Sequence, residues 1–172
     1  MSNPALRSRV YTIPSSKIRQ SLTECFNSAL NFWQSGNYVA EKMGFRIALG
    51  LWILGIEELG KYALLREANA NMDDRRGTLE IPIAVFKSHR TKLDHGQALL
   101  KKWGIDLEMA GIPLTNETRE SLWYVGWDEK KQEFKRDFRV LETGAFPKMG
   151  VLQELMRQGL NKMQELQRTS SA

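Results

Sequence analysis

The side chains best suited to chemistry gather in one short segment, residues 86–95, which reads FKSHRTKLDH. It contains both histidines of the chain, His89 and His95, together with the cationic residues Arg90 and Lys92. Imidazole is the side chain that exchanges protons near neutral pH. If the protein performs acid–base chemistry with imidazole, these two histidines are the candidates. Arg90 and His95 also form an Arg-x-x-x-x-His pattern, whose spacing alone is weakly specific.

A helix over this segment would place its polar residues on different faces. At about 100° per residue, His89 lies at the centre of the inner face, in line with Leu93 and Leu100. Lys92 lies about 60° to one side of His89, an unusual place for a lysine in an apolar seam. Arg90 and His95 lie further round, on opposite flanks. We therefore expect the two histidines to have different roles.

A second polar group follows the apolar run of residues 47–56, at Glu57-Glu58-Leu59-Gly60-Lys61. Glu57 and Lys61 are spaced i, i+4, so we expect them to pair on one helix face. Glu58 continues the stripe of Ile47, Leu51 and Leu54, where a carboxylate needs a partner. That partner is expected to be His89, either as a structural pair that holds two helices together or as an acid–base pair. The sequence leaves both readings open.

The composition restricts the other kinds of site. Cys25 is the single cysteine, so an internal disulfide and every multi-cysteine zinc motif are excluded. A metal site from Glu58, His89 and Asp94 is disfavoured, because Asp94 lies about 140° round the helix from His89. We expect no metal and no cofactor. The net charge of +5 permits an anionic partner such as RNA but does not require one.

The elements that must position these residues are helices. Apolar residues recur at three- and four-residue steps, and the stop signals are Ser35-Gly36-Asn37, Gly104, Gly111-Ile112-Pro113 and Gly126. The helices expected from this pattern span about 15–34, 38–70, 82–103, 115–125 and 148–167. The sequence thus predicts an all-α, up-and-down bundle of four to five helices.

At 172 residues the chain is expected to form a single helical domain over 1–172. We expect flexible ends at 1–13 and 168–172, and loops at 69–80 and 126–146. Its longest apolar run, residues 47–56, is much shorter than the ~20 residues of a membrane-spanning helix. The first twelve residues are polar and basic, without the apolar core of a secretory signal. These features predict a cytoplasmic protein without membrane contact.

Two strings of this sequence resemble the AbiV-type abortive-infection family of the HEPN superfamily. They are ALGLWILGIEELGK at residues 48–61 and FKSHRTKL at residues 86–93. The resemblance extends over about residues 29–125, and its last block contains Arg119 and Tyr124-Val125. The family block continues with Asp after Tyr-Val, whereas this chain has Gly126 there and Asp128 two positions later.

The resemblance implies a helical bundle with a role in bacterial defence against phage. Many HEPN domains are metal-independent RNA endonucleases that dimerise so that two Arg-x(4–6)-His motifs face one cleft. Carried onto this chain, Arg90 would bind the scissile phosphate, and His95 would be the general acid–base for attack by the ribose 2′-OH, which leaves a 2′,3′-cyclic phosphate. His89, Lys92, Glu58 and Lys61 match motif positions of the narrower family and would form or support the same site.

Two hypotheses follow from the resemblance. In the first, the protein is a homodimeric RNA endonuclease or a translation-blocking toxin, held inactive until infection. In the second, it is a non-catalytic sensor or inhibitor that binds a phage or host protein, and His89, Glu58 and Lys61 only hold the bundle together. A stability measurement separates them, because a structural His89 is needed for folding and a catalytic His89 is not.

Overall fold

The structure is a computed structural model that describes residues 9–42, 45–72, 77–111, 114–115, 118, 126–128, 133–135 and 146–170. The helices of these regions are α1 (Ser15–Lys42), α2 (Phe45–Ala70), α3 (Ile83–Lys87), α4 (His89–Lys102), the 3-10 turn η3 (Leu107–Ala110) and α7 (Phe146–Ser170). The strands are β1 (Val10–Pro14), β2 (Thr78–Pro82), β3 (Gly126–Asp128) and β4 (Glu133–Lys135). The predicted all-α bundle is confirmed, with two short antiparallel strand pairs added to it.

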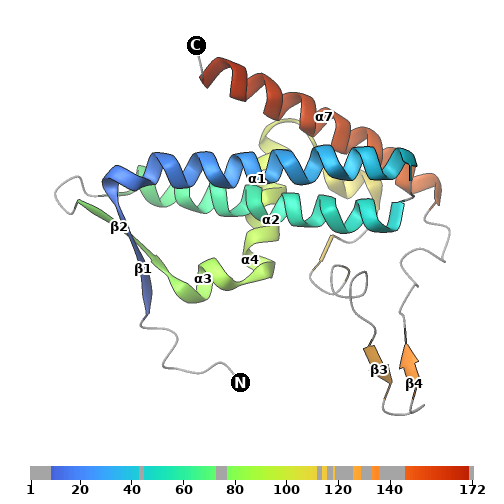
Figure 1. Cartoon of the computed structure of the whole chain (residues 1–172), viewed down its shortest axis with the longest axis horizontal. Helices are drawn as coiled ribbons and strands as arrows, with labels where there is room; N and C mark the ends of the chain where they lie inside the picture. Colours follow the sequence, from blue (N-terminus) through green and yellow to red (C-terminus); the bar gives the residue numbers. More distant parts are fainter. Residues whose placement is uncertain are drawn as a thin grey trace.

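The centre of the bundle is an antiparallel pair of long helices, α1 and α2, with α4 packed against α2 and α7 against α1 (Figure 1). Two fully buried tryptophans lie between α1 and α2. Trp33 Nε1 donates a hydrogen bond to the main-chain oxygen of Trp52 at 3.2 Å, and Gly55 leaves room for the Trp33 ring. A tryptophan buried in this way satisfies its N–H group and still contributes its large apolar area.

α1 continues through the residues expected to end it. We predicted a stop at Ser35-Gly36-Asn37, but the helix runs to Lys42. A Cβ at position 36 would lie 2.5 Å from the indole ring of Trp52, so the glycine makes room for that ring. The side-chain oxygen of Asn37 accepts a hydrogen bond from Trp52 Nε1 at 3.1 Å. Residue types that often end helices therefore serve the α1–α2 contact here, and the second helix begins at Phe45 rather than near Tyr38.

The strands β1 and β2 form an antiparallel pair that the sequence analysis did not predict. Their register pairs Ile13 with Leu79. β1 begins within the expected flexible segment 1–13 and extends to Pro14, and β2 begins at the end of the expected 69–80 loop and extends to Pro82. Leu79 and Ile81 alternate with exposed residues and are buried beside Leu65 of α2. Strands of five residues give too few repeats for the two-residue period to be recognised.

The strand pair β3–β4 likewise lies inside the expected 126–146 loop. Of the helix expected at 115–125, only two fragments belong to the described residues. Thr118 is helical, and its N–H donates a hydrogen bond to Thr115 Oγ1 at 3.2 Å. Thr115 thus accepts the hydrogen bond that is typical of a helix N-cap. Arg119, Trp123 and the remainder of this helix lie outside the described residues. The last helix, α7, contains the predicted span 148–167 and is slightly longer.

The expected 82–103 helix is divided in two at Ser88. This residue has extended backbone angles (φ −66°, ψ 113°), and its hydroxyl accepts a hydrogen bond from Thr91 N at 3.1 Å. A serine at this position caps the first turn of a new helix, so His89 is the first residue of α4 rather than part of a longer helix. The predicted end near Trp103 and Gly104 is confirmed, and Gly104 has a positive φ of 82°.

α2 and α4 touch through their backbones. A Cβ at Gly60 would lie 1.7 Å from the main-chain oxygen of Lys92, and a Cβ at Gly96 would lie 2.2 Å from that of Ile56. Each glycine therefore lets one helix approach the backbone of the other. This contact sets the distance between the part of α2 that contains Glu57 and the part of α4 that contains Lys92.

We expect Gly60→Ala to destabilise the fold by about 3 kcal/mol, because the methyl group meets backbone atoms that cannot rotate away. Gly150→Ala on α7 is the matched control. A Cβ there has nothing within 4 Å, so it should be neutral or stabilise by up to about 1 kcal/mol through helix propensity. Urea denaturation followed by circular dichroism measures both changes. Equal stability of the two variants would contradict the close backbone contact.

Among the described residues, no helix combines the length and the apolar character that are needed to cross a membrane.

Candidate functional site

A buried carboxylate lies where α2 meets α4. The side chain of Glu57 is 5% exposed, and its Oε2 atom lies 2.8 Å from His89 Nδ1 and 3.6 Å from Lys92 Nζ. Because a carboxylate only accepts hydrogen bonds, Nδ1 of His89 donates and carries the proton in this contact. Glu57, His89 and Lys92 are called the buried triad below. It joins two helices through one negative and up to two positive groups.

Lys92 is the least accessible cation of the triad, with a side chain only 7% exposed. Burial lowers the pKa of its ammonium group below the ordinary lysine value, and the nearby charge of Glu57 opposes this effect. The ion pair thus keeps a proton on a lysine that burial alone would deprotonate more easily.

His89 is the member of the triad that reaches the surface. Its side chain is 40% exposed, and Nδ1 is held by Glu57. A hydrogen bond at Nδ1 fixes the orientation and tautomer of the ring, so that Nε2 is the nitrogen able to take a proton. A carboxylate that orients an accessible imidazole is the arrangement used by acid–base catalysts.

The expected pairing of Glu58 with His89 is wrong, as is that of Glu57 with Lys61. Glu58 is instead hydrogen-bonded to Lys61, three residues further along α2. Consecutive helix residues point about 100° apart, so Glu57 faces α4 while Glu58 faces a different neighbour. Burial, reinforced by the charge of Glu58, raises the pKa of the Cys25 thiol on α1 to about 11. Cys25 is therefore a protonated, unreactive thiol at neutral pH.

The structure does not join Arg90 to the buried triad. Its side chain is 89% exposed, and Arg90 Nε lies 3.9 Å from Asp94 Oδ2 on the same helix. His95, half-buried on α4, stands six residues after His89, which corresponds to about 9 Å along a helix. In one copy of the chain, Arg90 and His95 therefore flank the triad on α4 without converging with it.

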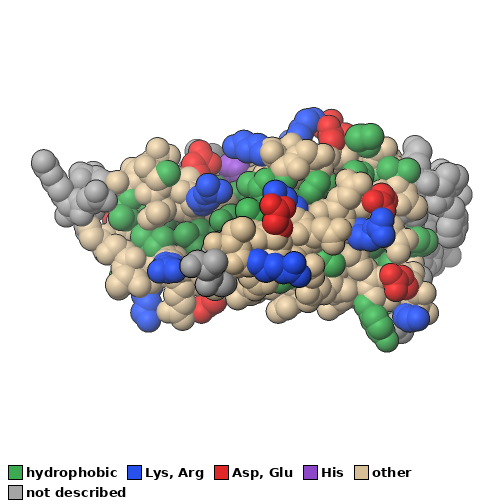
Figure 2. All heavy atoms as spheres, turned by 90° about the horizontal axis from the view of Figure 1, so that it is seen from above, with side chains coloured by type: hydrophobic (Ala, Val, Ile, Leu, Met, Phe, Trp, Pro, Cys, Tyr) green, Lys and Arg blue, Asp and Glu red, His purple; other side chains and the backbone are tan. Residues whose placement is uncertain are grey.

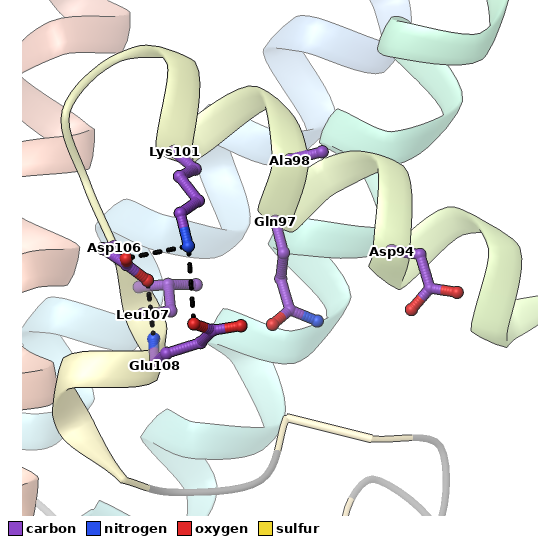
Figure 3. Close-up of a pocket in the computed structure, with 7 residues that line it drawn as sticks. All are labelled: Asp94, Gln97, Ala98, Lys101, Asp106, Leu107 and Glu108. Carbon is purple, nitrogen blue, oxygen red and sulfur yellow. Dashed lines mark hydrogen bonds and ion pairs between the residues drawn. The ribbon is translucent and has the colours of Figure 1, made fainter.

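A cavity of about 290 Å³ lies beside the other half of α4 (Figure 3). Here Lys101 Nζ contacts Asp106 Oδ2 at 3.0 Å and Glu108 Oε2 at 3.4 Å, which attaches the end of α4 to η3. The hydrogen bond to Asp106 raises the pKa of Lys101, and the pKa of Asp106 is lowered in return. Figure 3 shows Asp94 and Gln97 apart from this ion-pair group. None of the six residues predicted for the site lines this cavity.

Within the described regions, no three His, Cys, Asp or Glu side chains come together in a way that could hold a metal ion.

Glu57 is the site residue that the sequence analysis assigned to the wrong partner. The signal that could have identified it is its spacing from buried neighbours, because it follows Ile53 by four residues and precedes Gly60 by three. Those two residues belong to the α2 face that is turned toward the interior. The stripe chosen from the sequence included Ile47, which is 43% exposed.

Comparison with protein-family models identifies a family over most of the chain. A family model described as AbiV, of the HEPN group, matches residues 17–142. No curated protein and no solved structure matches the chain. The matched segment contains the whole buried triad together with Arg90 and His95, whereas α7 follows it.

Proposed function

Because the chain belongs to the AbiV family of HEPN abortive-infection proteins, we propose that it is a metal-independent RNA endonuclease of antiphage defence, acting in the cytoplasm. The observation that supports this proposal best is His89, whose Nδ1 is held at 2.8 Å by buried Glu57 while its side chain stays 40% exposed. An accessible, oriented imidazole is the group that RNA cleavage without a metal requires.

The proposed reaction removes a proton from the attacking 2′-OH and supplies a proton to the leaving 5′-oxygen. Neutral His89 accepts the proton of the ribose 2′-OH through Nε2, and the 2′-oxygen forms a bond to phosphorus. The bond from phosphorus to the 5′-oxygen breaks, and that oxygen takes a proton from a second, protonated imidazole, which we assign to His95. The products are a 2′,3′-cyclic phosphate and a free 5′-OH. Glu57 stabilises the imidazolium that forms at His89.

Arg90 is assigned to the phosphate. It is the residue next to His89 and its guanidinium is 89% exposed, so a phosphate can replace its long contact with Asp94. Arginine binds phosphate oxygens in a bidentate manner and stabilises charge that develops on them. Lys92 is a positioning residue in this scheme, because it touches Glu57 and is too buried to reach a substrate. Glu58 and Lys61 support α2 through their ion pair.

The scheme needs two copies of the chain. Arg90 and His95 lie about 140° apart round α4, so one copy does not direct both at the same phosphate. We propose that two protomers pair with their α4 helices across a shared cleft, so that Arg90 and His89 of one copy meet His95 of the other. Mixing equal amounts of inactive His89→Asn protein and inactive His95→Asn protein should then restore up to about a quarter of the wild-type activity. Half of the dimers are mixed, and only one of the two sites in each mixed dimer is intact.

RNA cleavage is tested with the purified dimer and an end-labelled RNA. We expect fragments that end in a 2′,3′-cyclic phosphate, with the same rate in EDTA, because no step uses a metal ion. DNA of the same sequence is the matched control and should remain intact, since it lacks the 2′-OH. Intact RNA, together with undiminished phage protection in cells that express His89→Ala or His95→Ala protein, would contradict the proposal.

A second candidate function is non-catalytic binding of a phage or host protein. It is favoured by the burial of Glu57 and Lys92, since a buried ion pair between two helices also suits a purely structural role. In that case the triad holds α2 against α4, and replacement of His89 changes stability rather than chemistry. The RNA cleavage and the stability of His89→Asn protein separate the two candidates.

A further inference from the structure

A second cavity, far larger than the one beside Lys101, lies along α1. It has a volume of about 780 Å³ and runs beside positions 19–27 of α1, with walls from α2, α7 and the end of α4. Positions 19–27 extend over ~12 Å, about two helical turns. We call it the α1 groove. None of the residues assigned to the RNA-cleavage site lines it.

The floor of the α1 groove is apolar. Leu22 and Phe26 lie one turn apart on α1, and Leu166 of α7 lies opposite them. The Phe26 and Tyr62 rings pack edge to face, with centroids 5.4 Å apart and planes at 60°. Figure 2 shows the α7 side of the molecule, where hydrophobic side chains are exposed between lysine and arginine side chains. A groove about two turns long with such a floor is the size that an amphipathic helix fills with two or three side chains.

The rim of the α1 groove is positively charged. Arg19 of α1 and Arg66 of α2 are both exposed and line the groove, and no aspartate or glutamate lines it. Neither guanidinium takes part in the ion pairs found between described residues, in contrast to Arg90 and Arg157. Arginine forms strong, directional contacts with carboxylates. The rim therefore complements an acidic partner.

We infer that the α1 groove is a docking surface for an acidic amphipathic helix of a partner protein. The apolar face of the partner helix packs on Leu22, Phe26 and Leu166. The carboxylates of the partner helix pair with Arg19 and Arg66. The edge-to-face contact of Phe26 with Tyr62 occupies these two rings with each other, which favours aliphatic anchors over stacked nucleotide bases. This inference is independent of RNA cleavage. One wall comes from α7, which follows the segment that the family model matches.

Charge reversal tests the inference. The probe is a fluorescent helical peptide of roughly 14 residues, or about four turns, with leucines along one face and glutamates elsewhere; a second peptide has lysines in place of the glutamates. The wild-type protein should bind the acidic peptide, and raised salt should weaken the binding. The double variant Arg19→Glu/Arg66→Glu should bind it about tenfold more weakly or worse and should prefer the lysine peptide.

The control variant is Arg157→Glu, an exposed arginine of α7 that does not line the groove. It changes the net charge by the same amount per site and should bind the acidic peptide like the wild type. A peptide with alanines in place of its leucines should lose binding to every variant. Equal binding of the acidic peptide to wild type and double variant would overturn the inference. So would a mononucleotide or short RNA that binds through Arg19 and Arg66 when the peptide does not.

Discussion

His89→Asn protein should fold like the wild type and lose RNA cleavage by about 10²- to 10⁴-fold, the usual contribution of a general acid–base group. The asparagine amide occupies the place of Nδ1 and can donate the same hydrogen bond to Glu57, but it cannot accept a proton. The contact that joins α4 to α2 is kept while the chemistry is removed. Single-turnover cleavage of a labelled RNA and urea denaturation measure the two properties on one preparation.

The result of this substitution separates a catalytic from a structural His89. A structural role predicts unchanged function for His89→Asn and clear destabilisation for His89→Ala, which leaves the Glu57 carboxylate with one partner fewer. A catalytic role predicts loss of activity in both variants, whatever their stability. Phage protection that survives His89→Asn would remove the residue from the mechanism and favour the protein-binding alternative.

Glu57→Leu should destabilise the protein by about 3–5 kcal/mol, because it leaves the buried ammonium of Lys92 without its counter-charge. The double variant Glu57→Leu/Lys92→Met should recover most of this loss, since it replaces a buried ion pair with apolar side chains of similar size. Glu58→Gln is the control. Its ion pair with Lys61 joins two partly exposed side chains of the same helix and should contribute less than about 1 kcal/mol.

The pH dependence of Glu57→Leu gives a second measurement. Burial lowers the pKa of Lys92 in the folded protein, and without Glu57 only the smaller effect of the Glu58 charge opposes it. Between this lowered pKa and the ordinary lysine value, the unfolded chain binds more protons than the folded chain, so stability rises with pH. The destabilisation of Glu57→Leu should therefore shrink from neutral pH toward pH 10. A loss that stays constant over this range would show that the ammonium is not buried as described.

The sequence predicted most of the helical framework because helices repeat their pattern many times. α7 and the end of α4 at Gly104 follow directly from apolar spacing and helix stop signals. Ser88 was not recognised as a boundary, because a serine inside a helical pattern becomes a cap only if its backbone turns extended. At Gly36 the error is the opposite, because a helix end was expected there and the helix continues. Gly36 makes room for the ring of Trp52 on the neighbouring helix α2, a contact that the local sequence does not show.

His89 and Lys92 of α4 meet a glutamate of α2, but that glutamate is Glu57 and not the expected Glu58. α2 is apolar on most of its circumference, so the hydrophobic pattern alone does not show which face is turned inward. The choice of face decides whether Glu57 or Glu58 meets His89, since the two point about 100° apart. The burial of Lys92 could be expected from the sequence, because Lys92 lies beside the apolar face of its helix. In the proposed mechanism Arg90 and His95 act together only across two copies, an arrangement that the spacing of residues within one chain does not encode.

The β1–β2 ribbon determines how far this protein can be trimmed. The N–H of Ile83 donates to the carbonyl of Arg9 at 2.9 Å, and the N–H of Ser15 donates to that of Gly77 at 3.0 Å. These bonds attach β2, the strand before α3, to residues 9–15, and so help to position Ser88 and His89. A fragment cut to the family boundaries at 17 and 142 would discard β1 and α7 together. If such a fragment were inactive, the cause would be the loss of the contacts made by β1 and α7, not an inactive site.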